Sequence, residues 1–107
     1  MIQSELSDQL SISYLNKQII PQCHAILKTL KEIKTANAEI QALNDIYVQA
    51  YTHICAGHML LRESLVTDSY SASLLAEERY LKGQQSERKF INRIKALKTG
   101  KVNHYDQ

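Results

Sequence analysis

The stretch ILKTLKEIKTANAEIQALNDIYVQAYTHICAGHMLL, residues 26–61, carries the strongest periodic pattern in the chain. Large apolar side chains recur at every seventh residue, while the positions three and four residues further on hold many small or polar side chains. A sustained seven-residue repeat predicts helix with one face packed against another helix, as in a coiled coil. The repeating residues are Ile26, Ile33, Ile40, Tyr47, Ile54 and Leu61.

The same stretch leaves two arrangements open. No Gly or Pro interrupts residues 22–56, so a single long helix fits the pattern. A helix of about 40 residues would span ~60 Å, which is too long for a compact monomer of this size. Alternatively, two helices join near Thr35, Ala36 and Asn37 as a hairpin. Because the repeat is longer than the face that a compact monomer can cover, we expect a homodimer.

Helices are also predicted on both sides of this stretch. Residues 2–20 carry apolar side chains mostly three and four residues apart, and Pro21 is expected to break the chain before the next helix. The polar run at residues 67–69 (Thr67, Asp68, Ser69) is typical of a helix start. Gly83 is expected to end that helix, and a last helix is expected from Ser86 to Gly100. The sequence therefore predicts an all-α fold, a small bundle of four to five helices. Residues 1–100 would form one domain and residues 101–107 a flexible tail.

Composition narrows the class of protein. The chain has one Pro, three Gly and no Trp, which favours helix nearly throughout and an aliphatic core. No apolar run approaches the ~20 residues of a membrane span, and the N-terminus lacks the pattern of a signal peptide. Two cysteines are too few for a disulfide scaffold. We therefore expect free thiols and a cytoplasmic location.

The hexapeptide HICAGH, residues 53–58, is the most chemically loaded segment. On a helix Cys55 and His58 share a face, which suggests either two zinc ligands or a cysteine nucleophile with a histidine base. A closed zinc site needs four ligands, and a catalytic thiol needs an orienting group and an oxyanion donor that no motif here supplies. Cysteine is a common small core residue, and Gly57 admits a neighbouring helix closely. We therefore expect a structural segment, with no catalytic residue, no metal site and no cofactor.

Charge is distributed unevenly along the chain. Residues 1–78 hold five basic and nine acidic side chains, a net charge of −4, whereas residues 79–101 hold eight basic side chains and one acidic, a net charge of +7. Such an asymmetry suggests that the basic segment binds an acidic surface. The surface belongs either to a protein or to the phosphate backbone of a nucleic acid.

These observations favour a non-enzymatic helical module that binds a partner protein, as a regulator, adaptor or inhibitor. A nucleic-acid-binding protein that uses the basic segment 79–101 is the alternative, and a metal- or thiol-dependent enzyme is the third hypothesis. The candidate residues for apolar association are Tyr47, Tyr51, Ile54, His58 and Leu61, and those for an acidic partner are Arg88, Lys89, Arg93, Lys95 and Lys98.

Overall fold

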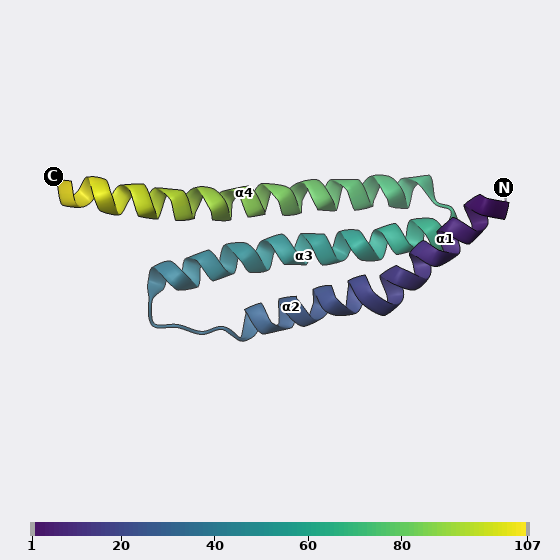
Figure 1. The fold of residues 1–107 in the computed structure, drawn as a ribbon, viewed down its shortest axis with the longest axis horizontal. Coiled ribbons are helices and arrows are strands. Elements are labelled where there is room, and N and C mark those ends of the chain that lie inside the picture. Colours follow the sequence, from purple (N-terminus) through teal and green to yellow (C-terminus); the bar gives the residue numbers. More distant parts are fainter. Residues whose placement is uncertain (1, 107) are drawn as a thin grey trace.

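The computed structural model describes residues 2–106, with side chains described from residue 7 to residue 99. Over this range every residue is helical except 33–37 and 68–69. The elements are α1 (Ile2–Tyr14), the π-helical segment η1 (Leu15–Ile19), α2 (Ile20–Glu32), α3 (Ala38–Thr67) and α4 (Tyr70–Asp106). The predicted all-α class is confirmed. Because α1, η1 and α2 follow one another without a break, the chain forms three rods instead of four to five separate helices (Figure 1).

The three rods form an open, elongated arrangement. α3 lies between the other two rods and runs antiparallel to both, so the two chain ends lie at opposite ends of the molecule (Figure 1). Among the described residues, no Cα atom of α4 lies within 8 Å of one in α1, η1 or α2. The molecule measures 66 × 24 × 20 Å, and its radius of gyration is 18.1 Å. A compact chain of this length would have a radius of gyration of about 13 Å.

Pro21 does not break the chain, contrary to the prediction from sequence. It lies in the first turn of α2, directly after a helical segment, so its missing N–H removes one hydrogen bond from the continuous rod. Just before it, η1 widens the helix, and the backbone N–H of Ile20 donates to the carbonyl oxygen of Leu15. A single π-helical segment changes the hydrogen-bond register without interrupting the helix. α1 and α2 therefore continue as one rod.

The connection between α2 and α3 takes the hairpin form of the two that the sequence left open. Asn37 caps α3, because its side-chain oxygen Oδ1 accepts the backbone N–H of Ile40 at 3.0 Å. One heptad further on, the Asn44 side-chain nitrogen Nδ2 donates to the carbonyl oxygen of Leu30 at 2.8 Å. That carbonyl lies at the C-terminal end of α2, where it also accepts the backbone N–H of Ile33 at 3.2 Å. The two asparagines thus define the start of α3 and its alignment with α2.

The predicted helix start at residues 67–69 is confirmed. Asp68 ends α3 in the left-handed backbone region, with φ 53°. The Ser69 hydroxyl oxygen then accepts the backbone N–H of Ala72 at 3.1 Å, which satisfies one of the free amides at the start of α4.

Beyond this start α4 is a single helix, so the predicted helix end at Gly83 and the predicted new start at Ser86 are wrong. Both residues are buried inside α4. A Cβ atom on Gly83 would lie 2.7 Å from Cγ1 of Ile54 in α3, so the glycine serves close packing. Glycine in a helix costs only about 1 kcal/mol relative to alanine, and packing along α3 outweighs that cost. The backbone also passes Gly100, the second predicted end, and continues to Asp106; Gln107 lies outside the described residues.

The core is thin and follows α3. Among the described residues, no large side chain is completely buried. None of the described helices is long and apolar enough to span a membrane. The buried apolar residues are mostly small: Leu15, Ile20, Cys23, Ala50, Cys55, Ala72 and Ala76.

Candidate partner-binding site

The HICAGH segment lies in the middle of α3 and contacts both neighbouring rods. Cys55 is bonded to Cys23 of α2, so the predicted pair of free thiols is wrong. The two Cα atoms lie 5.8 Å apart, and both cysteines are buried. With its sulfur in a disulfide, Cys55 presents no thiolate, which both the zinc-ligand and the nucleophile hypotheses require.

The register of the hairpin explains this pairing. A tight turn near residue 36, with helix on both sides, would place Cys23 opposite Gln49. Instead, residues 33–37 leave α2 in an extended conformation and run beyond its end before α3 begins (Figure 1). Extended chain advances about 3.3 Å per residue, compared with 1.5 Å in a helix. The residue opposite Cys23 therefore lies further along α3, at Cys55.

His58 faces α4, where it contacts Tyr80. The imidazole Nδ1 lies 2.7 Å from the Tyr80 hydroxyl oxygen, and the two rings meet edge to face with centroids 5.3 Å apart. Burial lowers the pKa of His58 and raises the pKa of Tyr80. The imidazole is therefore neutral near pH 7, and in the tautomer with an unprotonated Nδ1 it accepts a hydrogen bond from the Tyr80 hydroxyl. Gly57 makes room for this ring, because a Cβ atom on it would lie 2.8 Å from Tyr80.

His53 also contacts α4, through the guanidinium group of Arg79. Its Nδ1 atom lies 3.1 Å from the Arg79 guanidinium, which donates to it. Burial, and then the charges of Arg79 and Lys82, lower the pKa of His53. Within the part of the chain that the structure describes, no three His, Cys, Asp or Glu side chains lie together as a metal site would require. Each histidine of HICAGH is thus held by a partner on α4.

The predicted apolar anchors lie along the contact between α3 and α4. The Tyr47 ring packs on Phe90 with centroids 4.8 Å apart and meets Tyr51 edge to face at 5.2 Å. Ile54 covers Gly83, and Leu61 is half-buried on the same stripe. Because all five candidates stay partly exposed, the stripe is a seam within the chain with an accessible edge.

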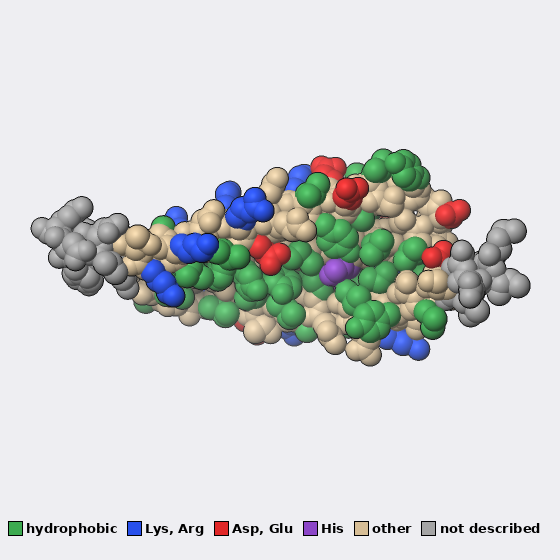
Figure 2. Space-filling model, turned by 45° about the horizontal axis from the view of Figure 1, so that its top comes forward, with side chains coloured by type: hydrophobic (Ala, Val, Ile, Leu, Met, Phe, Trp, Pro, Cys, Tyr) green, Lys and Arg blue, Asp and Glu red, His purple; other side chains and the backbone are tan. Residues whose placement is uncertain are grey.

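The five predicted basic residues are all exposed on α4. Arg93 forms an ion pair with Glu39 of α3 at 3.5 Å. Each helical residue turns about 100°, so Lys89 points roughly 100° away from Arg88, whereas Lys95 points in nearly the same direction as Arg88. The five cations are therefore spread over the sides of the helix that do not pack on α3. On the face shown in Figure 2, Lys and Arg gather toward the C-terminal end, and most Asp and Glu lie toward the other end.

Four of the exposed apolar residues on α4 share a flank that was not predicted from the sequence; Leu75, which is 50% exposed, lies on another side of the helix. The exposed fractions are 77% for Tyr70, 48% for Leu74, 52% for Leu81 and 49% for Ile91. These residues lie on one flank of α4, because they are separated by 4, 7 and 10 residues. The spacing was available in the sequence, but only the structure shows that α3 covers a different side of this helix.

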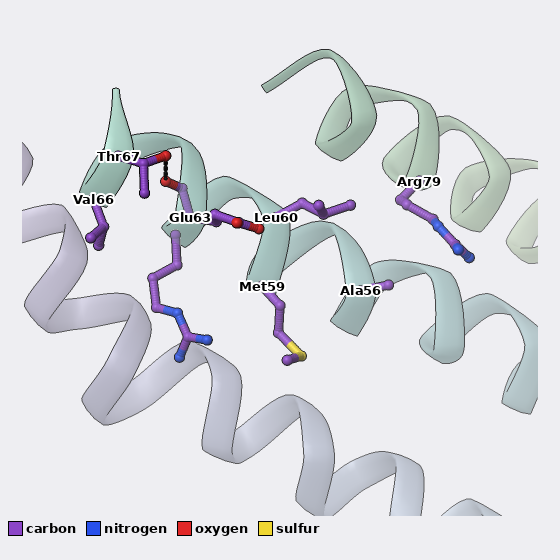
Figure 3. A pocket seen from close by; sticks show the side chains of 8 residues that line it. Ala56, Met59, Leu60, Glu63, Val66, Thr67 and Arg79 are labelled. Atoms are coloured by element: carbon purple, nitrogen blue, oxygen red, sulfur yellow. Dashed lines mark hydrogen bonds between the residues drawn. The ribbon is translucent and has the colours of Figure 1, made fainter. Parts of the chain in front are cut away.

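A second accessible region is an open hollow of about 460 Å³ near the turn between α3 and α4 (Figure 3). Its apolar lining comes from α3 and includes Met59, Leu60 and Val66, and Arg79 reaches it from α4. Val66 is 60% exposed, so the hollow offers apolar contact at the surface.

Comparison of the chain with family models, with curated proteins and with solved structures found no match.

Proposed function

We propose that the chain is a non-enzymatic helical interaction module that acts by binding a partner protein, as a regulator, adaptor or inhibitor. The observation that carries this proposal is the amount of exposed surface. The accessible surface is 7889 Å², whereas a compact monomer of this mass exposes about 6,100 Å². Apolar side chains such as Tyr70 and Val66 contribute to it. Exposed large apolar side chains that lie together on a surface are typical of proteins that bind other proteins.

The open arrangement of the rods explains where this surface comes from. Each outer rod packs on α3, and the outer rods do not meet among the described residues. A helix needs apolar cover along its whole apolar stripe, and here each outer rod has cover from α3 alone. A further helix from a partner would supply the missing cover, as in complexes where an amphipathic helix binds in a groove.

The basic end of α4 favours a protein partner over a nucleic acid. Exposed Ile91 lies between Arg88 and Lys95 on the same flank, and an apolar side chain there contributes nothing to phosphate contacts. Arg93 is already paired with Glu39. An acidic protein surface with apolar side chains in it matches this mixture better. The basic residues would then raise the association rate and the specificity.

A homodimer is part of the proposal. The predicted coiled-coil stripe does not provide its interface, because Tyr47 and Ile54 already pack against α4 of the same chain. The interface of a homodimer must therefore lie on another side of the molecule. A cytoplasmic location stays a prediction, and it has lost the free thiols on which it was based, since disulfides persist mainly in oxidising compartments.

Affinity capture from the cells that make the protein tests this function. We expect the partner proteins to stay bound to the wild type after nuclease treatment, and we expect the Lys89→Glu/Arg93→Glu variant to capture none of them. The matched control is Lys28→Glu/Lys31→Glu, which makes the same charge change on exposed positions of α2. Loss of all captured proteins on nuclease treatment would instead support the nucleic-acid alternative. Equal loss from both variants would show that net charge, and not the basic end of α4, governs binding.

A further inference from the structure

The side of α4 that packs on α3 is well defined. Tyr80 lies against Gly57, and Gly83 lies against Ile54. Phe90 continues the same seam, because its ring packs on Tyr47. These contacts fix the orientation of α4 about its own axis, so the direction of its remaining side chains follows from the helical angle of about 100° per residue.

A second stripe, which we name the flank stripe, lies about a third of a turn from that seam. Its residues are separated alternately by four and three positions, and they are all exposed. The acidic member lies in the first half of the stripe and the basic members in the second half. Four members are large and apolar. The flank stripe consists of Tyr70, Leu74, Glu77, Leu81, Gln84, Arg88, Ile91 and Lys95.

We infer that the flank stripe binds the flank stripe of a second copy of this chain, with the two α4 helices antiparallel and residue i opposite residue 165 − i. This inference rests on the proposed dimeric module and names its interface. A parallel pair would place Arg88 against Arg88 and repel. In the antiparallel pair, Glu77 lies opposite Arg88 of the second copy.

The same register matches the apolar positions. Leu74 lies opposite Ile91. Lys95 lies opposite the exposed ring of Tyr70, and its ammonium group can form a cation–π contact with that ring. Leu81 lies opposite the stem of Gln84 near the centre. Because a twofold axis relates the two copies, each of these contacts occurs twice.

The length of the flank stripe suits such an interface. The whole chain exposes about 1,800 Å² more than a compact monomer of its mass, and a stable interface of ordinary size needs about 800 Å² from each partner. The part of α4 from Tyr70 to Lys95 is ~39 Å long at 1.5 Å per residue. An antiparallel pair of that length covers the four apolar members of the flank stripe in both copies.

A register shifted by one heptad is the nearest competitor. It places Glu77 opposite Lys95 and Leu81 opposite Ile91, but it leaves Leu74 opposite the charged Lys98. The register that we infer pairs Leu74 with an apolar residue instead. The two registers predict different charge partners for Glu77, so charge exchange distinguishes them.

Sedimentation of the full chain, with its disulfide intact, tests the inference. We expect the wild type to be a dimer, and Glu77→Arg and Arg88→Glu each to weaken the dimer at least tenfold. The double variant Glu77→Arg/Arg88→Glu should recover wild-type association. Lys89→Glu is the matched control, because it changes the charge of the neighbouring residue, which points away from the flank stripe, and it should leave the dimer unchanged.

Three results would overturn the inference: a monomeric wild type at 200 μM, a double variant that stays monomeric, or rescue of Glu77→Arg by Lys95→Glu instead of Arg88→Glu.

Oxidation of Leu74→Cys/Ile91→Cys gives a second, independent measurement. The double-cysteine variant should form a covalent dimer, and Leu74→Cys alone should not, because the two Leu74 positions would lie ~25 Å apart along the axis. A covalent dimer from both variants, or from neither, would contradict the register. Since Lys89→Glu/Arg93→Glu tests partner binding, failure of the dimer and failure of the proposed function are separable.

Discussion

The disulfide between Cys23 and Cys55 should dominate the attachment of α2 to α3. It closes a loop with a sequence separation of 32, and the chain-entropy relation gives a stabilisation of about 3.7 kcal/mol at 25 °C for a loop of that length. Few other groups hold this rod, since Leu15, Ile20 and Cys23 are its buried apolar residues among those described. The whole domain is expected to be stable by only about 5–15 kcal/mol. Loss of the disulfide therefore removes a large share of the free energy of unfolding.

Urea denaturation followed by circular dichroism measures this contribution. We expect the Cys23→Ala/Cys55→Ala variant and the reduced wild type to unfold at a much lower urea concentration than the oxidised wild type. Reductant should have no effect on the variant, which serves as the control for side effects of the reagent. An oxidised and a reduced protein that differ by less than about 1 kcal/mol would refute the reasoning, since the loop-closure relation predicts several times more.

Three further predictions concern α3. Gly57→Ala should destabilise the fold by about 1 kcal/mol in urea denaturation, because a Cβ atom 2.8 Å from Tyr80 adds an overpacking cost that exceeds the helix-propensity gain of alanine; a more stable variant would contradict this. The free energy of unfolding should fall as pH drops below 6.5, because burial lowers the folded-state pKa of His58 and His53 and the unfolded chain then binds protons more readily. His58→Asn should reduce that slope, and an unchanged slope would exclude His58 as a cause. Asn37→Ala should cost about 1 kcal/mol through loss of the helix cap, and a change within the error of denaturation would show that the cap contributes little.

The helical class and the connection at residues 67–69 were predictable because their causes are local, whereas the hairpin near residue 36 was one of two arrangements that the sequence left open. Asn37 and Ser69 satisfy free amides at the starts of α3 and α4, and short polar side chains do this wherever the neighbouring residues favour helix. The exposure of the basic residues was also predictable, since charged side chains such as Lys89 are rarely buried without a partner. These features need no knowledge of how the rods pack.

The wrong predictions have causes that the residue pattern does not show. Gly83 and Pro21 both weaken a helix. At Gly83 the helix continues because of a neighbour distant in sequence, whereas at Pro21 it continues because of the π-helical segment directly before it. Ile54 of α3 fills the space above Gly83, and η1 shifts the hydrogen-bond register just before Pro21. The pairing of Cys23 with Cys55 depended on the extended connection at residues 33–37. The residue pattern does not specify how far this connection advances along the helix axis.

For the candidate site, the sequence by itself determined which residues carry charge and which side chains repeat along a helix. Tertiary structure decided which side of each helix stays exposed. Tyr47 and Ile54 were expected at an interface with a partner, but α4 already packs on them, whereas Leu74 and Ile91 remain half-exposed. Helical periodicity fixes the angle between side chains on one rod. The rotation of that rod against its neighbour depends on contacts between distant residues, such as Tyr80 with Gly57, where a ring can approach only because the glycine has no side chain.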